Sequence, residues 1–160
     1  MKGKIVINAS PIILLYKADL EFVLPALFSS IIIPKGVMDE ISVHEEDEVE
    51  RRIRSQRDFT ICGVGLEPLV QAWDLGKGET DVISFAYHDP AHIPVLDDSA
   101  AKACCRAFGL RTLGTGVLLI LAKQNGLLSS VREPLEMLRA KGMWIADSVI
   151  DLLCKRAGEK

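Results

Sequence analysis

Five short strand-like runs, most of them apolar and β-branched, constrain the fold of this chain more than any other feature. They are continuous rather than alternating, which is typical of parallel strands buried on both faces. The runs lie at Ile5–Ile7, Ile31–Ile33, Phe59–Cys62, Ile93–Leu96 and Arg111–Leu113, each bounded by turn residues. Because helical patterns separate them, the sequence predicts an α/β fold in which a small parallel sheet is sandwiched by helices. Phe59–Cys62, the weakest of these patterns, is expected at an edge of the sheet.

Residues that begin and end helices stand between these runs. Short polar side chains accept hydrogen bonds from the free amides of a first helical turn, and proline suits that turn because it has no amide. Glycine ends helices because it adopts the left-handed conformation readily. The predicted starts are Ser10–Pro11 (N-cap and first helical position), Pro34, Asp98–Ser99, Thr115 and a capping box at Ser130–Glu133, and the predicted ends are Gly109 and Gly126.

The chain is expected to form one domain, residues 1–160, because it shows no internal repeat and no flexible linker. From residue 115 onward the strand patterns stop, and helical segments near 115–125, 130–141 and 146–157 predict a mainly helical C-terminal extension. The charged stretch from His44 to Asp58 predicts a solvated helix, with a contact to RNA as the alternative. Its expected ion pairs, between residues four apart, are Asp47/Arg51, Glu48/Arg52 and Glu50/Arg54.

Charge is unevenly distributed along the chain. The net charge is −3, but residues 1–99 carry 9 Lys and Arg against 17 Asp and Glu, whereas residues 100–160 carry 10 against 5. An acidic half joined to a basic half is typical of a metal pocket beside a phosphate-binding surface, although ordinary domains also show such splits. With 49% hydrophobic and 26% charged residues, the chain is expected to be globular.

Several other classes of site receive no support from the sequence. The four cysteines (Cys62, Cys104, Cys105 and Cys154) show no C-x-x-C spacing, so buried free thiols are predicted rather than a metal site. The three histidines form no zinc-ligand pattern. The longest apolar runs are too short to span a bilayer and the N-terminus has no secretory layout. No membrane partner is therefore expected, and the cytoplasm is the predicted location.

Acidic and polar residues gather where the predicted strands end. The carboxyl ends of parallel strands share one edge of a sheet, where ligands bind near the switch in strand order. Hydrolysis of a phosphodiester needs a nucleophilic water and relief of the charge that grows on phosphate oxygens. Divalent cations held by carboxylates provide both, and oxygen ligands suit Mg²⁺ or Mn²⁺. The candidates are Asn8 and Ser10 after the first run, Glu40 after the second, Glu79 and Asp81 in a helix near Gly78, and Asp97 and Asp98 after the fourth run.

Each candidate also has a purely structural interpretation. Glu79 continues the apolar stripe of its helix and so faces the sheet, but a carboxylate there also stabilises a first helical turn. Asp98 is predicted to be an N-cap, which leaves Asp97 as the ligand of the pair. Lys102 and Arg106, four residues apart on one helix, either contact RNA phosphates or are simply solvated.

Several short motifs follow one another in a particular order along nearly the whole chain. They are Asn8–Leu15, Ile33–Ile41, Leu75–Glu79, Val95–Asp98 with Ala101 and Arg106, Leu113–Val117, Ala122–Leu127, Leu138–Gly142 and Ala157–Glu159. In order and spacing they resemble PIN domains of the VapC-like kind, in the branch that begins with an N-A-S-P segment. The resemblance implies a small parallel sheet sandwiched by helices and a metal-dependent cleavage of single-stranded RNA, often as the toxin of a toxin–antitoxin pair.

The resemblance also implies roles for individual acids. Glu40 matches the second acid of the family and Asp97 the fourth, while the third falls on Glu79 or Asp81. Most members have an aspartate where this chain has Asn8. An amide can bind a cation through its carbonyl oxygen but brings no charge, so occupancy of a second metal position is in question. The implied ligands are these five residues together with Asp98.

Two hydroxyl residues are expected to support the site. Ser10 matches the small hydroxyl residue that accompanies the first acid and could bind a metal-linked water, unless it is only the N-cap. Thr115 follows the last predicted strand.

An unrelated phosphate-handling α/β domain, such as a receiver, also gathers acids at strand ends. It would need a lysine where this chain has Gly114 and Thr115, so this interpretation has little support.

Two functions remain open from the sequence. The first is a Mg²⁺- or Mn²⁺-dependent ribonuclease, plausibly a toxin neutralised by a small antitoxin-like protein. The second is a degenerate PIN module that binds RNA or a protein without cutting, and Asn8 is its indication. The resemblance further implies a homodimer, with Phe22, Leu24 and Leu27 as candidate interface residues.

Overall fold

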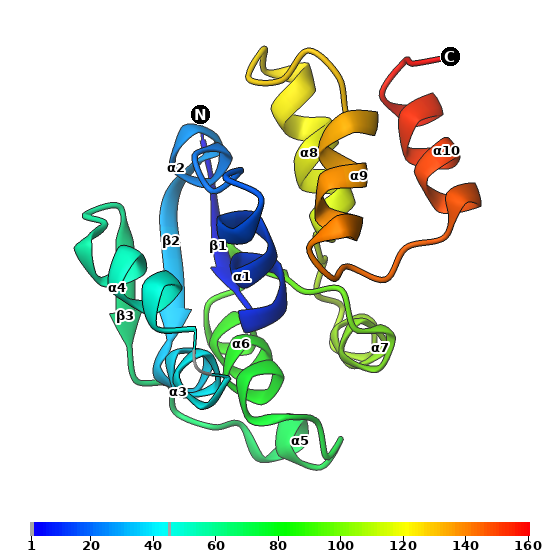
Figure 1. Ribbon diagram of the computed structural model, residues 1–160. Helices are drawn as coiled ribbons and strands as arrows, with labels where there is room; N and C mark the ends of the chain where they lie inside the picture. Colours follow the sequence, from blue (N-terminus) through cyan, green and yellow to red (C-terminus); the bar gives the residue numbers. More distant parts are fainter. Residues whose placement is uncertain (1, 45) are drawn as a thin grey trace.

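The computed structural model describes residues 2–44 and 46–160. Within these residues, four parallel strands form one sheet in the order β3-β2-β1-β4 (Figure 1). The strands are β1 (Gly3–Ile7), β2 (Phe28–Pro34), β3 (Phe59–Cys62) and β4 (His92–Val95). The predicted parallel sheet with surrounding helices is confirmed, and β3 lies at its edge as expected.

The continuous apolar runs form this sheet because both of its faces are covered. Ile5, Val6 and Ile7 of β1 are all completely buried, although their side chains alternate between the two faces. Burial of each such side chain contributes about 1.5–3 kcal/mol, so a central strand with a polar face would be costly here.

Helices surround the sheet and make up most of the C-terminal part. Those before β4 are α1 (Ala9–Lys17), α2 (Val23–Leu27), α3 (Lys35–Val43), α4 (Asp47–Ser55), α5 (Pro68–Gln71) and α6 (Lys77–His88). Those after it are α7 (Ser99–Ala107), α8 (Thr115–Gln124), α9 (Arg132–Ala140) and α10 (Asp147–Arg156). The last three contact one another and stand side by side in Figure 1, which confirms the predicted helical extension. None of the helices that the structure describes has the length and apolar character needed to cross a membrane.

The strand order reverses between β1 and β4. From β1 the chain moves outward to β2 and then β3, and it returns to the other side of β1 at β4. Ile7 pairs with Val95 at the carboxyl ends of the two strands, and the Asn8 amide donates a hydrogen bond to the Val95 carbonyl at 3.1 Å. In parallel α/β sheets, a crevice beyond such a switch point is the usual ligand site.

The predicted fifth strand, Arg111–Leu113, is reduced to a single bridge. Leu113 lies parallel to Val95, and its amide donates to the Pro94 carbonyl at 2.9 Å, but no ladder extends beyond it. The prediction of a strand there is wrong because only Leu113 of the three residues belongs to the apolar core region. Its pairing nevertheless brings Gly114 and Thr115 beside the end of β4.

Some predicted helix starts are confirmed and others are wrong. Pro34 is the N-cap of α3, and Asp98 is the N-cap of α7, where its carboxylate accepts from the Ala101 amide at 2.9 Å. Helix α1 begins earlier than predicted, at Ala9, with Asn8 at the N-cap position. Ser10 therefore lies inside the first turn and caps nothing.

The other two predicted starts fail because tertiary partners take over the capping. Thr115 is the first residue of α8 rather than its cap, and its side chain bonds to Asp97 instead. The capping box at Ser130–Glu133 does not form, since α9 begins at Arg132. The Val131 amide there donates to the Glu159 carboxylate at 2.6 Å, which comes from beyond α10.

Helix α4 forms within the charged stretch, but only one of its three predicted ion pairs does. Glu50 and Arg54 pair at 3.0 Å. The Glu48/Arg52 prediction is wrong, because Arg52 turns to Glu21 and lies over the Tyr16 ring at 4.7 Å. Asp47 and Arg51 likewise form no ion pair with each other.

Packing of the core decides two further predictions. Cys104, Cys105 and Cys154 are buried free thiols as predicted, whereas Cys62 is only half-buried. Among the candidate interface residues, Leu24 is completely buried in the core, so it cannot contact a second chain. Leu27 packs partly against the same core, and only Phe22 is exposed.

Candidate active site

Two adjoining clefts open at the carboxyl ends of β1 and β4. They share the wall residues Asn8, Ser10, Leu14, Glu79 and Gly142. Glu40 completes the first cleft, and Asp97 and Asp98 complete the second. Five of the predicted oxygen ligands therefore line one continuous depression, although they come from separate stretches of the chain.

Asn8 is the first residue after β1 and points into both clefts. Its side chain is only 5% exposed, yet Oδ1 has no hydrogen-bond partner among the residues that the structure describes. An unpaired buried polar group costs about 1–3 kcal/mol. A ligand that bonds to this oxygen would relieve that cost.

Glu40 reaches from α3 to the first turn of α6. Its Oε1 accepts a hydrogen bond from the Gly78 amide at 2.7 Å. Glycine is needed there, because a Cβ on residue 78 would lie 2.7 Å from Glu40 Oε2 and 2.8 Å from Asn8 Oδ1. Oxygens from Asn8, which follows β1, and from Glu40 of α3 thus converge on one point of the α6 backbone. Gly76 makes similar room for the carboxylate of Glu79.

Glu79 lies in the first turn of α6 and lines both clefts. Burial raises the pKa of its carboxyl above the ordinary value, and the nearby charges of Glu40 and Asp98 add to the rise. The direction shows that the cleft concentrates negative charge where water screens it poorly. A cation placed there would be attracted.

Asp97 follows β4 and is held by the first residue of α8. Its Oδ1 accepts from the Thr115 amide at 2.8 Å, and its Oδ2 accepts from the Thr115 hydroxyl at 2.6 Å. Two charge-assisted bonds fix the carboxylate in one orientation. The single β-bridge at Leu113 brings Thr115 close enough to Asp97 to donate both hydrogen bonds.

Asp81 does not join the other acids. It is buried, and its Oδ2 accepts from the Gly36 amide at 2.9 Å, which ties the first turn of α3 to α6. It lies two residues after Glu79 on α6, and a residue two positions away on a helix points to a different side. Of the two candidates for the third acid, the geometry favours Glu79, and Asp81 has a structural position.

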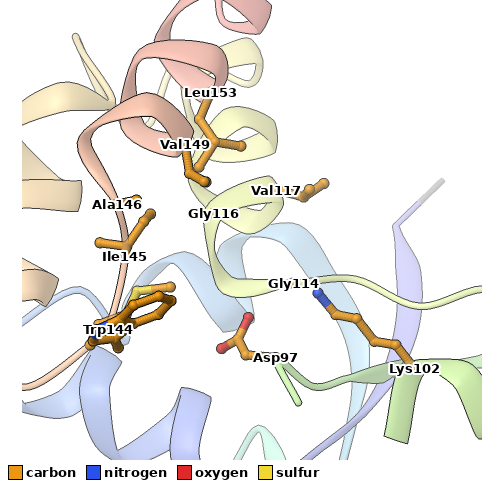
Figure 2. A pocket seen from close by; sticks show the side chains of 11 residues that line it. Asp97, Lys102, Gly114, Gly116, Val117, Trp144, Ile145, Ala146, Val149 and Leu153 are labelled. Carbon is orange, nitrogen blue, oxygen red and sulfur yellow. The ribbon is translucent and has the colours of Figure 1, made fainter. Parts of the chain in front are cut away.

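The remaining predicted residues lie around the clefts. Ser10 is exposed and lines both of them, consistent with contact to a bound water or ligand. Lys102 extends from α7 into a neighbouring cavity that Asp97 also lines (Figure 2). Arg106 is exposed one turn further along α7. Neither cation forms an ion pair with an acid in the described part of the chain.

Comparison with known families places the whole chain. A family model described as a PIN domain matches residues 4–159, which is nearly the whole chain. The chain belongs to the PIN-domain family. PIN domains have a nuclease-type fold. No curated protein matches the chain.

The side chains of this PIN domain suit a hard cation that keeps part of its water shell. The cleft offers carboxylate and amide oxygens, including the unpaired Oδ1 of Asn8. No three Asp, Glu, His or Cys side chains within residues 2–44 and 46–160 stand close enough to enclose an ion on their own. Mg²⁺ does not require such a cage, because it is commonly bound through one or two carboxylates, waters and substrate phosphates.

Sequence reasoning missed two features of this PIN domain site. The first is the pair Gly76 and Gly78, whose missing side chains leave room for three oxygen-bearing side chains. The second is Trp144, which lines the acidic cleft although it follows α9, far along the chain. The run Met143–Ala146 is apolar although it follows Gly142, which ends the preceding helical pattern, and this was the one usable signal.

Proposed function

We propose that this PIN domain is a Mg²⁺- or Mn²⁺-dependent endoribonuclease that hydrolyses phosphodiester bonds of single-stranded RNA. One observation carries the proposal: Asn8, Glu40, Glu79, Asp97 and Asp98 line one depression at the switch point of the sheet. Carboxylates crowded in this way repel one another; the pKa of Glu79 is raised chiefly by burial, and the charges of Glu40 and Asp98 add to the rise. A cation in the cleft offsets this repulsion.

The roles follow from where each side chain is held. Asp97, fixed by Thr115, is the best-oriented ligand, and Glu40 and Asn8 present oxygens from the opposite wall. When bound, a divalent cation supplies charge that stabilises the phosphate oxygens and makes water more acidic. Asp98 keeps its role as the cap of α7 and contributes negative charge at the rim.

The proposed reaction is an in-line displacement at phosphorus. A water oxygen forms the new bond to phosphorus, and the bond from phosphorus to the 3′-oxygen breaks. Burial raises the pKa of Glu79, so it holds a proton more readily than a free glutamate, which suits it to accept the proton that the water gives up. The leaving 3′-oxygen takes a proton from solvent.

RNA is the substrate class that the surroundings support. Lys102 lines the cavity next to the cleft, and Arg106 lies four residues further along α7; in this proposal both contact phosphates of the strand. The C-terminal part, residues 100–160, is the basic half of the chain, with 10 Lys and Arg against 5 Asp and Glu. Single-stranded RNA bends into a cleft more easily than a duplex does.

The biological setting is proposed from the resemblance to VapC-like PIN domains. In that setting the protein is the toxin of a toxin–antitoxin pair in the cytoplasm, it binds a small antitoxin-like protein, and it forms a homodimer. With Leu24 buried, the exposed Phe22 and the partly buried Leu27 remain as interface candidates. If a short open reading frame lies directly upstream of its gene, co-expression of the two followed by size-exclusion chromatography tests the pair and the dimer together.

Asn8 favours a second candidate, a degenerate module that binds RNA or a protein without cutting it. An amide in place of the usual aspartate removes one unit of negative charge from the cleft and lowers its attraction for cations. In this case the unpaired Oδ1 of Asn8 lies at a position that no longer binds a metal ion.

Cleavage of labelled single-stranded RNA separates the two candidates. Purified protein is incubated with Mn²⁺ or with a chelator, beside Asp97→Asn and the matched control Glu133→Gln, an exposed carboxylate on α9. Cleavage that is lost in the chelator and in Asp97→Asn but kept in the control supports the nuclease. Cleavage that persists in Asp97→Asn contradicts it. No cleavage by the unmodified chain, with a gain of cleavage in Asn8→Asp, supports the degenerate module.

A further inference from the structure

Trp144 is the most exposed large apolar residue in the described chain. Its side chain is 93% exposed, in the segment that connects α9 to α10. The neighbours Met143 and Ile145 pack partly against the hydrophobic core and therefore hold the segment in place. In the part of the chain that the structure describes, no other aromatic ring stacks on the indole. An anchored backbone thus presents a free aromatic face to solvent.

Trp144 lies at the boundary between the acidic cleft and a second, mainly apolar cavity. It lines the acidic cleft with Asn8, Glu79 and Asp97, and it also lines a largely apolar cavity between α8 and α10. Asp97 belongs to both linings as well. Figure 2 shows the indole and Lys102 on either side of the Asp97 carboxylate, with Val149 and Leu153 of α10 above them. The aromatic face is therefore a direct neighbour of the proposed reaction centre.

Charges of both signs lie around the indole: Glu79, Asp97 and Asp98 line the acidic cleft with it, and Lys102, in the neighbouring cavity, can contact a phosphate group. Lys102 shares the cavity with Trp144, and Lys141 lies three residues before it. Within residues 2–44 and 46–160 neither lysine is in an ion pair. The nearest acid along the chain, Asp147, is already paired with Arg139 at 2.5 Å and adds little net charge to this wall.

We propose that Trp144 stacks against one unpaired nucleobase of the bound RNA and so sets the position of the adjacent phosphate at Asp97. The proposal rests on the proposed ribonuclease function and deepens it, because it assigns a base-binding subsite to the same cleft. Every base has a π-face, so the subsite recognises single-stranded character rather than sequence. A paired base cannot reach the indole, which would exclude duplex RNA.

Fluorescence tests the contact directly, because the chain has two tryptophans. Trp73→Phe leaves Trp144 as the only one, and Asp97→Asn in the same protein prevents cleavage. In Mg²⁺ buffer, a single-stranded oligouridylate is expected to quench the remaining emission, whereas an abasic ribose-phosphate oligomer of equal charge is not. Equal quenching by both oligomers, or by neither, overturns the proposal.

Affinity provides the second measurement. Stacking on an aromatic residue strengthens single-strand binding by about 5- to 150-fold per base, so Trp144→Ala is expected to weaken oligouridylate binding by a factor in that range. Trp144→Phe should retain most of the affinity, and Trp73→Ala is the matched control, since Trp73 is 41% exposed on another part of the surface. Loss of affinity that Trp144→Phe does not rescue contradicts stacking.

The outcomes separate this proposal from the ribonuclease function. If the unmodified chain cleaves RNA and Trp144→Ala cleaves and binds equally well, the base subsite is wrong while the nuclease stands. If oligouridylate quenches Trp144 but no cleavage occurs, the nuclease is wrong while the subsite stands. Protection of Trp144 by a bound antitoxin-like protein, without any response to RNA, identifies a protein-binding face and overturns the base subsite.

Discussion

Substitution of Gly78 by alanine tests whether the converging oxygens of the cleft matter more for activity than for stability. A Cβ at this position would lie 2.7 Å from Glu40 Oε2 and 2.8 Å from Asn8 Oδ1, whereas ordinary contact begins at 3.4 Å. Both oxygens must therefore retreat by roughly 0.7 Å or turn away. A displacement near 1 Å at a reacting centre costs up to about 100-fold in rate, so a loss of about 10- to 100-fold in kcat/KM is expected.

The effect on folding should be smaller, because opposing changes partly cancel. Moving Glu40 weakens its bond from the Gly78 amide, which costs about 1.5–3 kcal/mol at most. Alanine in place of glycine inside a helix returns about 0.5–1 kcal/mol. The free energy of unfolding should therefore fall by about 0.5–2 kcal/mol, measured by urea denaturation in chelator. Cleavage assays on the same preparations give the activity.

Gly65→Ala is the matched control for this substitution. A Cβ at Gly65 would meet no atom within 4 Å, so neither activity nor stability should change appreciably. Activity of Gly78→Ala at the unmodified level would refute the role assigned to Glu40 and Asn8. An equal loss of activity in Gly65→Ala would show that the assay reports something other than the cleft.

Three further predictions concern single side chains. Burial raises the folded-state pKa of Glu79, so ionisation of this carboxyl opposes folding. In chelator, Glu79→Gln should have the same stability as the unmodified chain at pH 3.5 and should become relatively more stable as the pH rises through the raised pKa. A stability difference that does not change with pH would contradict this. Thr115→Val removes the hydroxyl bond to Asp97, so it should lower the free energy of unfolding by about 1–2 kcal/mol. The Mn²⁺ affinity, measured by calorimetry, should fall by about 10- to 100-fold. Unchanged affinity would contradict the role assigned to the hydroxyl in orienting Asp97 as a ligand. Asn8→Asp adds a carboxylate to an already acidic cleft. It should therefore raise the Mn²⁺ affinity and lower the melting temperature measured in chelator. A fall in Mn²⁺ affinity would place the ion elsewhere.

The sheet could be predicted from sequence because its strands are apolar on both faces. A completely buried apolar run such as Ile5–Ile7, with helices on either side in the sequence, is most often a central parallel strand. The end of that strand determines where Asn8 lies. The fifth strand could not be predicted, because a single bridge at Leu113 and a full strand look alike in a three-residue pattern. Helix starts were predictable only where the cap is local, as at Asp98. Where Glu159 supplies the partner from a distant segment, no local pattern shows it.

The candidate site was predictable in its composition but not in its details. Carboxylates that follow parallel strands must share an edge, so the gathering of Glu40, Glu79 and Asp97 was foreseeable. The sequence did not show which side of α6 faces the cleft. In the structure Glu79 lines the cleft, whereas Asp81 accepts a hydrogen bond from the Gly36 amide. Trp144 reaches the cleft through the packing of the C-terminal helices, which no spacing along the sequence reveals.

Anomalous scattering from crystals soaked in Mn²⁺ tests the metal-binding role of the cleft most directly. A peak is expected in the depression between Asn8 and Asp97, within bonding distance of at least one of the carboxylates of Glu40, Glu79 and Asp97. In crystals of Asp97→Asn the same peak should be weaker or absent. An ordered cleft without a peak at saturating Mn²⁺, or a peak only elsewhere on the protein, would contradict a metal-dependent nuclease at this site.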